Sequence, residues 1–172
     1  LAITLDEGYG LEIAKTSVQT EYATIALEGT LGIRDQSLDL SPQLNYDDLN
    51  RLLEGPSEGE AVPVVARAPL GGTFQDVTIE PAVTLGGEAW IDGNLQVTLG
   101  ESIGAVGKVT MLSATAVIPE AYRDLMADGG VVDLDVVYAD NHIGLDDTVV
   151  RVGETSLRAT GTIDLAQSLL DM

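Results

Sequence analysis

The chain has 172 residues, no cysteine and a formal net charge of −20, because 28 Asp and Glu residues outnumber 8 Lys and Arg residues. The lack of cysteine excludes disulfides, thiolate nucleophiles and cysteine-ligated metal sites. The scarcity of cations argues against a nucleic-acid partner and against a polybasic surface for docking on anionic membranes. The acidity fits a solubility role, a high-salt habitat or divalent-cation binding along an acidic face.

The length and hydropathy pattern predict one soluble unit covering residues 1–172. A membrane-spanning helix needs about 20 consecutive apolar residues, and no such run occurs, so we expect no membrane-spanning segment in this chain. The N-terminal residues lack the basic flank and cleavage pattern of a signal peptide. The chain as given is expected to be soluble, and both a mature form and an excised fragment stay open.

Alternation of apolar and polar residues predicts strands along most of the chain. In chain order, the strands are expected at 23–33, 62–67, 74–80, 82–91, 95–99, 107–118, 132–138, 147–152 and 157–165. The turn signals between them are Gly71-Gly72, Gly86-Gly87, Asp92-Gly93-Asn94, Gly100 and Asp140-Asn141. Two short helices are expected at 46–54 and 119–128, because Gly-Pro and Gly-Gly pairs follow them and Pro119 occupies a tolerated first-turn position.

These elements predict an all-β fold, mainly antiparallel, built as a curved sheet or a sandwich with two short helices. The segments 23–33, 132–138 and 157–165 show the cleanest alternation. Their apolar positions are expected to form either a core face or a lipid-binding groove. The candidates are Ile25, Leu27, Leu31, Ile33, Val132, Leu134, Val136, Leu157, Ile163 and Leu165.

Internal similarity suggests that a strand, strand, helix, strand unit is used twice. The segment starting at Ala23 aligns without a gap on the segment starting at Thr155, and Gly29 then matches Gly161. Both expected helices contain a Tyr-x-Asp-Leu sequence. A duplication would give two related halves, about 1–81 and 82–172, whereas chance similarity among short Gly, Thr and Leu strings is the competing explanation.

Several strands share the form apolar, x, apolar, x, Gly-Thr, apolar, Asp-Leu. The segments are Leu27-Glu28-Gly29-Thr30-Leu31, Ala159-Thr160-Gly161-Thr162-Ile163-Asp164-Leu165, and Val62-Pro63-Val64 leading into Gly72-Thr73-Phe74 and Ile79-Glu80-Pro81. This grammar resembles the C-terminal repeats of the AsmA-like proteins, a superfamily that includes the bacterial bridge-like lipid-transport proteins. The resemblance covers about half of the chain and rests on amphipathic strands without a chemical signature.

The resemblance implies a long, curved antiparallel sheet whose apolar concave face holds lipid acyl chains. It also implies a periplasmic location with an anchor at the inner membrane. The present chain departs from that pattern, because it contains no anchor and 172 residues cannot bridge two membranes. A fragment, a small relative or a stacking subunit would reconcile the difference.

Candidate catalytic groups are few. His142 is the only histidine and lies in an Asp-Asn-His sequence typical of a loop, and no serine lies in a Gly-x-Ser-x-Gly elbow. The glycines of 100–107 have the wrong spacing for a dinucleotide fingerprint and predict a bend between strands. We therefore expect no catalytic residue, no cofactor and no enzymatic activity.

Asp133 and Asp135 are the best metal candidates. Alternate positions on a strand point the same way and lie about 7 Å apart, a spacing compatible with calcium or with a glycosidase pair. The sequence lacks a Asp-x-Asp-x-Asp-Gly calcium loop, so a solvated strand face is the expected outcome and no metal site is assigned.

Two functional hypotheses remain. The first is a non-enzymatic, extracytoplasmic β-groove that binds or conducts lipid or another hydrophobic ligand. The second is a structural subunit of an extracellular filament or surface assembly, in which self-association or a sheet-edge partner acts through β-strand addition. The N-terminal residues 1–5 could supply such a strand.

Overall fold

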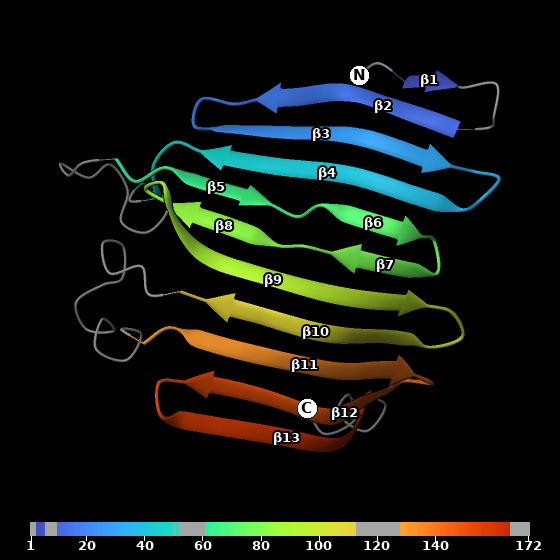
Figure 1. Ribbon diagram of the computed structural model, residues 1–172, viewed down its shortest axis with the longest axis vertical. Coiled ribbons are helices and arrows are strands. Elements are labelled where there is room, and N and C mark those ends of the chain that lie inside the picture. The colour runs from blue at the N-terminus through green and yellow to red at the C-terminus, as the bar shows by residue number, and fades with distance from the viewer. Residues whose placement is uncertain (1–2, 6–9, 50, 52–60, 113–127, 166–172) are drawn as a thin grey trace.

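The computed structural model describes residues 3–5, 10–49, 51, 61–112 and 128–165, which form a 13-stranded antiparallel sheet (Figure 1). The strands are β1 (Ile3–Leu5), β2 (Gly10–Gln19), β3 (Ala23–Gly32), β4 (Ser37–Tyr46), β5 (Val64–Arg67), β6 (Leu70–Thr73), β7 (Asp76–Ile79), β8 (Ala82–Leu85), β9 (Glu88–Leu99), β10 (Ile103–Met111), β11 (Gly130–Ala139), β12 (His142–Val152) and β13 (Thr155–Asp164). The all-β, antiparallel fold expected from the sequence is confirmed.

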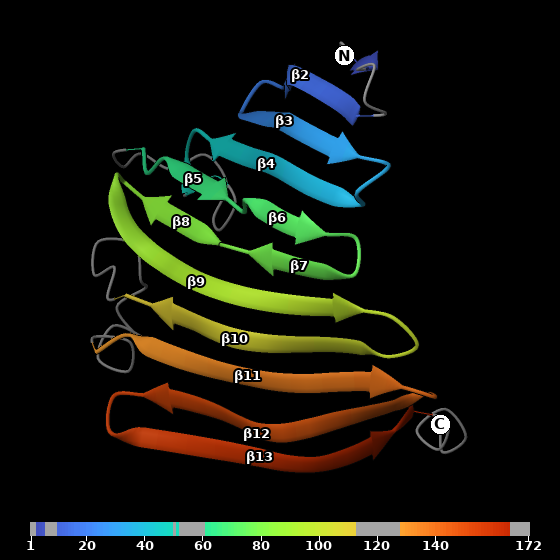
Figure 2. The same cartoon turned by 45° about the vertical axis from the view of Figure 1, so that its right-hand side comes forward.

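The strands follow one another across the sheet nearly in chain order, from β1 at one edge to β13 at the other. The strands β5 and β6 occupy one row beside β4, and β8 and β7 occupy the next row beside β9. Figure 2 shows these two interrupted rows next to the long, curved β9. Short turns join the neighbouring strands β2 and β3, β3 and β4, β6 and β7, β8 and β9, β9 and β10, β11 and β12, and β12 and β13, as alternating antiparallel strands allow.

Among the described residues the sheet is a single layer. Every pair of strands in extensive contact is a hydrogen-bonded pair of neighbours, so no described element packs across either face. The accessible surface is 11773 Å², whereas a compact monomer of 18.0 kDa exposes about 8,000 Å². Only Val77, Leu85 and Val149 are buried hydrophobic residues in the described part. The described residues therefore enclose almost no core, and they form one curved sheet and no sandwich.

A line of bend-forming residues crosses the sheet halfway along the strands. The pairing registers align Gly29 of β3 with Leu40 of β4, and Leu95 of β9 with Gly107 of β10. Between them, Pro69 separates β5 from β6 and Pro81 separates β7 from β8, because proline has no N–H for the ladder. Bulges in β2 and β12 lie on the same line. Bulges and interior glycines bend strands, which accounts for the curvature of the sheet.

Close backbone approach explains two of these glycines. A Cβ on Gly29 would lie 2.0 Å from the carbonyl oxygen of Asp39 in β4, and Gly29 has a φ of +146°. A Cβ on Gly107 would lie 2.2 Å from the carbonyl oxygen of Asn94 in β9. Any side chain at either position would force the neighbouring strand away.

The two hairpins matched by sequence are built alike. At the offset that aligns Ala23 with Thr155, β2 and β3 match β12 and β13, and corresponding residues pair in the same register. Each hairpin has a bulge in its first strand, between Ile13 and Thr16 or between Leu145 and Thr148. The division of the chain into two related halves, 1–81 and 82–172, stays a prediction.

The two expected helices are not supported by the described residues. Tyr46 belongs to β4 instead, because it continues the alternation of Leu40, Pro42 and Leu44 and pairs with Ala23. Residues 50 and 52–54 lie outside the described part of the chain, as do residues 119–127 of the second expected helix.

Other boundaries also differ from the expectation. The residues 92–94 and Gly71-Gly72 lie inside β9 and β6 instead of forming turns, and the strand expected at 82–91 is divided by a turn at Gly86-Gly87. The turns at Gly100 and at Asp140-Asn141 are confirmed. The strands β2 and β4 were not expected.

Candidate apolar binding face

One face of the sheet is apolar from β2 to β13. Residues directly opposite each other in antiparallel strands point to the same side, so the registers define rows of side chains across the sheet. One row consists of Val18, Ile25, Leu44, Ala66, Val83, Ile91, Met111, Gly130, Val152 and Thr155. A second row consists of Val77, Val97, Ala105, Val136, Leu145 and Gly161. These rows and the strand positions that share their side are called the apolar face.

The opposite side of the same strands is polar. Its positions include Thr30 and Asp39 on β3 and β4, and Gln96, Lys108 and Asp133 further along the sheet. The division follows from the period of two in each strand, because one residue of shift would exchange the faces. The opposite side is called the polar face.

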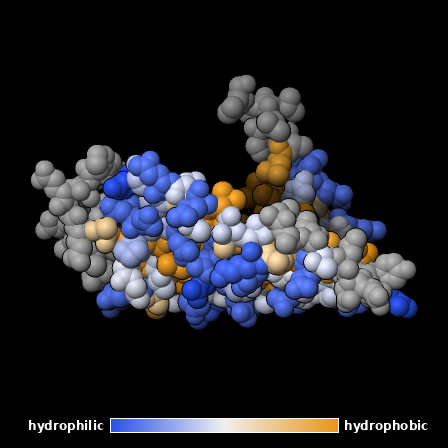
Figure 3. Space-filling view, turned by 90° about the horizontal axis from the view of Figure 1, so that it is seen from above, coloured by the Kyte–Doolittle hydropathy of each residue, from blue (hydrophilic) through white to orange (hydrophobic). Residues whose placement is uncertain are grey.

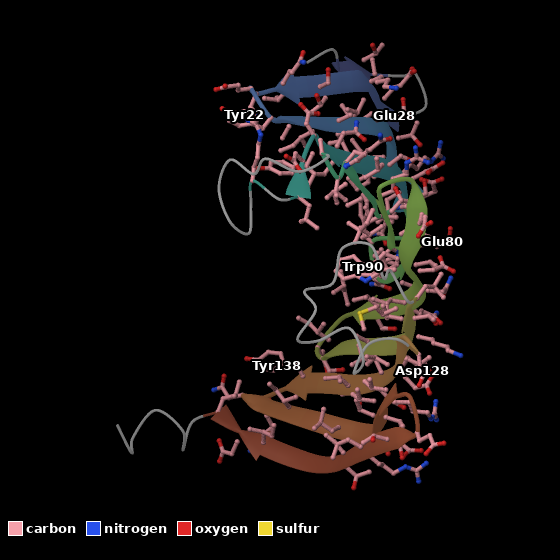
Figure 4. The ribbon with its side chains drawn as sticks, turned by 90° about the vertical axis from the view of Figure 1, so that its left-hand side faces the viewer. Tyr22, Glu28, Glu80, Trp90, Asp128 and Tyr138 are labelled. Atoms are coloured by element: carbon pink, nitrogen blue, oxygen red, sulfur yellow. The ribbon has the colours of Figure 1, made fainter. Side chains whose placement is uncertain are left out.

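The apolar face is the hollow side of the sheet. Figure 4 views the sheet from its side, with Trp90 and Tyr138 in the hollow and Glu28 and Glu80 on the outer side. Tyr138 pairs with Ile103 and so belongs to the apolar face. Figure 3, which looks along the stack of strands, shows hydrophobic residues in the dip at the upper middle and mostly hydrophilic residues along the lower edge.

Many side chains of the apolar face remain in contact with solvent. Ile25 is 56% exposed and Leu157, its counterpart in the second hairpin, is 68% exposed. Other exposed residues of this face are Val18, Leu44, Leu99, Ile103, Tyr138, Val150 and Ile163. Soluble proteins rarely expose contiguous apolar patches on this scale, and such patches mark sites of interaction.

A hollow of about 390 Å³ opens on this face beside the interrupted strands. Its lining is Ile25, Pro42, Gln43, Leu44, Ala66, Arg67, Ala68, Pro81 and Val83. It forms where the ladder is weakened: the amide of Ala68 donates to the carbonyl of Pro42 at 3.3 Å, and Pro69 and Pro81 cannot donate. Pro81 of the bend line thus also lines this hollow of the apolar face.

The pairing registers place eight of the ten residues proposed from the sequence on the apolar face, in two groups on β3 and on β11 and β13. The eight on the apolar face are Ile25, Leu27, Leu31, Val132, Leu134, Val136, Leu157 and Ile163. Ile33 lies in the turn between β3 and β4, and Leu165 follows β13. The strands β2 and β4 also contribute to this face without having been predicted, although the alternation of Leu38, Leu40 and Leu44 was a sequence signal for β4.

Asp133 and Asp135 lie on the polar face. Asp133 accepts a hydrogen bond from Nη1 of Arg151 at 2.5 Å and therefore forms an ion pair across the strands. Arg158 and Asp147 form a second pair, with Nε and Oδ1 2.9 Å apart. Among the described residues no group of three or more His, Cys, Asp or Glu side chains has an arrangement that could hold a metal ion.

The sole histidine lies beside a turn at the sheet edge. His142 Nδ1 is 2.7 Å from the carbonyl oxygen of Asp140, and Nε2 is 3.9 Å from Oδ2 of Asp164. Two side chains in other turns, Tyr22 and Asp35, have pKa values displaced from their ordinary range. The hydrogen bond to Glu21 raises the pKa of Tyr22, and the hydroxyl of Ser37 lowers the pKa of Asp35. Neither His142 nor Tyr22 nor Asp35 lines the hollow of about 390 Å³.

No family model matches the sequence, and no curated protein and no solved structure matches the chain. Within the described ranges, no helix has both the length and the hydropathy that are needed to cross a membrane.

Proposed function

We propose that the apolar face binds lipid acyl chains or similar hydrophobic ligands, and that the protein is a non-enzymatic module acting outside the cytoplasm. The observation that carries this proposal is the continuous apolar face on the hollow side, which no described element covers. Full burial of one aliphatic side chain stabilises by roughly 1.5–3 kcal/mol, so a ligand that covers several of them gains substantial free energy.

The chemistry of the face favours flexible aliphatic ligands. Apart from Gly130, Gly161 and Thr155, the two defined rows carry valine, leucine, isoleucine, alanine and methionine, and none of their side chains is charged. Such a surface offers dispersion contacts without polar groups that would select one headgroup. Broad acceptance of acyl chains is therefore expected. The AsmA-like resemblance supports the same ligand class and a periplasmic location.

Native mass spectrometry of gently purified protein tests this proposal. The expected result is phospholipid-mass adducts on the protein, and the delipidated protein should take up added phosphatidylglycerol or phosphatidylethanolamine. A delipidated protein that takes up no phospholipid would contradict the proposal.

A matched set of variants locates the ligand. Ile25→Glu and Leu157→Glu place a charge on the apolar face, whereas Val106→Glu replaces a 52% exposed aliphatic residue on the polar face. All three positions are exposed, so similar effects on folding are expected. Lipid uptake should fall at least tenfold in the first two variants and stay unchanged in the third.

The alternative function is a structural subunit that assembles by β-strand addition. The observation that favours it is β13, a ten-residue edge strand without lysine or proline, two of the residues that commonly protect edges. Electron microscopy distinguishes the two functions. Regular polymers free of lipid would support the assembly, whereas lipid-loaded monomers would support the groove.

A further inference from the structure

The edge of β13 corresponds to an interior position elsewhere in the same sheet. In the aligned hairpins, β13 matches β3, and β3 is paired on its outer side with β4 over its whole length. In the described structure β13 has β12 on one side and no strand on the other. No described strand therefore occupies the aligned position of β4 beside β13.

The glycine of β13 retains the geometry that a neighbouring strand would require. Gly29 and Gly161 are aligned and have φ values of +146° and +136°. At Gly29 an added Cβ would lie 2.0 Å from the backbone of β4, whereas at Gly161 it would meet no atom of the described residues within 4 Å. The conformation that admits close approach is thus present at Gly161 together with open space.

Side-chain chemistry fits the same occupant. If a strand with the sequence of β4 pairs with β13 in the register of β3, Leu44 lies opposite Leu157 and Leu38 lies opposite Ile163. On the other face, Asp39 lies opposite Thr162. Apolar residues thus meet apolar residues and polar residues meet polar residues. A shift of one residue would place leucines on the polar face.

We infer that the β13 edge is a docking surface for an antiparallel strand of the β4 pattern, supplied by a partner protein in which such a strand lies at a free edge, because the β4 of a second copy of this chain is already paired on both sides. Addition of this strand extends the apolar face beyond β13, since the leucines of the new strand continue its rows. The backbone hydrogen bonds of the edge provide affinity, and the leucine positions and Gly161 provide register. This inference does not depend on lipid binding.

Amide hydrogen exchange on the full chain tests the inference. The probe is an acetylated and amidated peptide with the sequence of residues 37–46, SLDLSPQLNY. It should slow exchange of the β13 amides that are not bonded to β12 by at least tenfold, without changing exchange in β1. A control peptide with aspartate in place of Leu38 and Leu44 should have no effect.

A protein variant tests the register. Gly161→Ala places a methyl group where the added strand would pass, and it should abolish protection by the peptide. Thr160→Ala, at the neighbouring position on the polar face, should leave it intact. Circular dichroism and exchange in β11 and β12 confirm that both variants fold.

Three results would overturn the inference. The first is the absence of protection at every peptide concentration that stays soluble. The second is equal protection by the aspartate peptide. The third is protection of β13 that grows with protein concentration without peptide, because a second copy pairing edge to edge would then be the occupant.

Discussion

Gly29 and Gly161 form a natural pair for measuring what a neighbouring strand contributes. The two glycines have similar positive φ values and the same register next to a bulge. Only Gly29 has a strand on its outer side, with the carbonyl oxygen of Asp39 2.0 Å from the position of an added Cβ. Alanine at each position therefore adds the same conformational strain, and a steric overlap only at position 29.

The magnitudes follow from these two contributions. Holding alanine in a backbone conformation that non-glycine residues rarely adopt lowers the free energy of unfolding by about 1–3 kcal/mol, and this strain applies to both variants. Relief of the overlap at position 29 requires β3 and β4 to separate, and each ladder hydrogen bond lost costs about 0.5–1.5 kcal/mol. Gly29→Ala should therefore lower the free energy of unfolding by about 1–2 kcal/mol more than Gly161→Ala.

Urea unfolding followed by far-ultraviolet circular dichroism measures this difference, provided the slope with urea is unchanged. Gly71→Ala is the control, because an added Cβ there meets no atom within 4 Å and the backbone φ is not positive. It should change the free energy of unfolding by less than about 0.5 kcal/mol. Equal destabilisation by Gly29→Ala and Gly161→Ala would refute the reasoning, because the close approach of β4 would then carry no cost.

Leu85 is only 4% exposed. Leu85→Ala should therefore lower the free energy of unfolding, measured with urea, by about 2–3 kcal/mol. A loss below about 0.5 kcal/mol would show that the neighbouring residues fill the space and leave no cavity. The ion pair between Arg151 and Asp133 is about half exposed. A double-mutant cycle with Arg151→Gln and Asp133→Asn should therefore give a coupling free energy of about 0.2–1 kcal/mol that shrinks in 1 M salt. A larger coupling that does not change with salt would contradict the assignment as a surface ion pair. The hydrogen bond from the Ser37 hydroxyl lowers the pKa of Asp35 in the folded protein. The bond therefore stabilises the β3–β4 turn fully when the pH is above the pKa of Asp35 in the unfolded chain, and this stabilisation is lost as the pH falls through the lower pKa of the folded state. Nuclear magnetic resonance titration should show the pKa of Asp35 rising towards its ordinary value in Ser37→Ala, and an unchanged pKa would exclude the hydroxyl as the cause.

Alternation predicted much of the sheet because each strand has one apolar and one polar face. The segments 23–33, 132–138 and 157–165 correspond to β3, β11 and β13, and their apolar residues share a face. Hairpin turns at Gly86-Gly87 and Asp140-Asn141 carried the usual turn chemistry. In these places local sequence and tertiary pairing agree.

Prediction failed where residues that normally interrupt strands were tolerated. Pro42 lies inside β4, and Gly93 lies inside β9, so both positions were interpreted as breaks or left unassigned. In the structure they lie within continuous strands, each two residues from the bend line, with Pro42 opposite Leu27 and Gly93 opposite Val109. A single sequence does not show that such residues from separate strands lie side by side, because that depends on pairing registers between distant segments.

The hollow beside Pro81 was not predictable for the same reason. Its lining comes from β3, β4, β5 and β8, and it exists because two adjacent rows are interrupted at the same level. The sequence indicated which residues are apolar. Alternation left a curved sheet and a sandwich as alternatives, and an apolar concave face was implied only by the AsmA-like resemblance.

The central claim is that the hollow, apolar face contacts acyl chains, and Trp90 allows a direct measurement. It is the only tryptophan in the chain, and it lies on the hollow side (Figure 4). Fluorescence should be measured while the delipidated protein takes up phosphatidylcholine with bromine atoms on its acyl chains, since bromine quenches tryptophan only at close range.

Quenching should depend on the position of bromine along the acyl chain. It should disappear in Ile25→Glu and persist in Val106→Glu. Lipid uptake without quenching at any bromine position, or equal quenching in both variants, would contradict the claim that the apolar face is the binding surface.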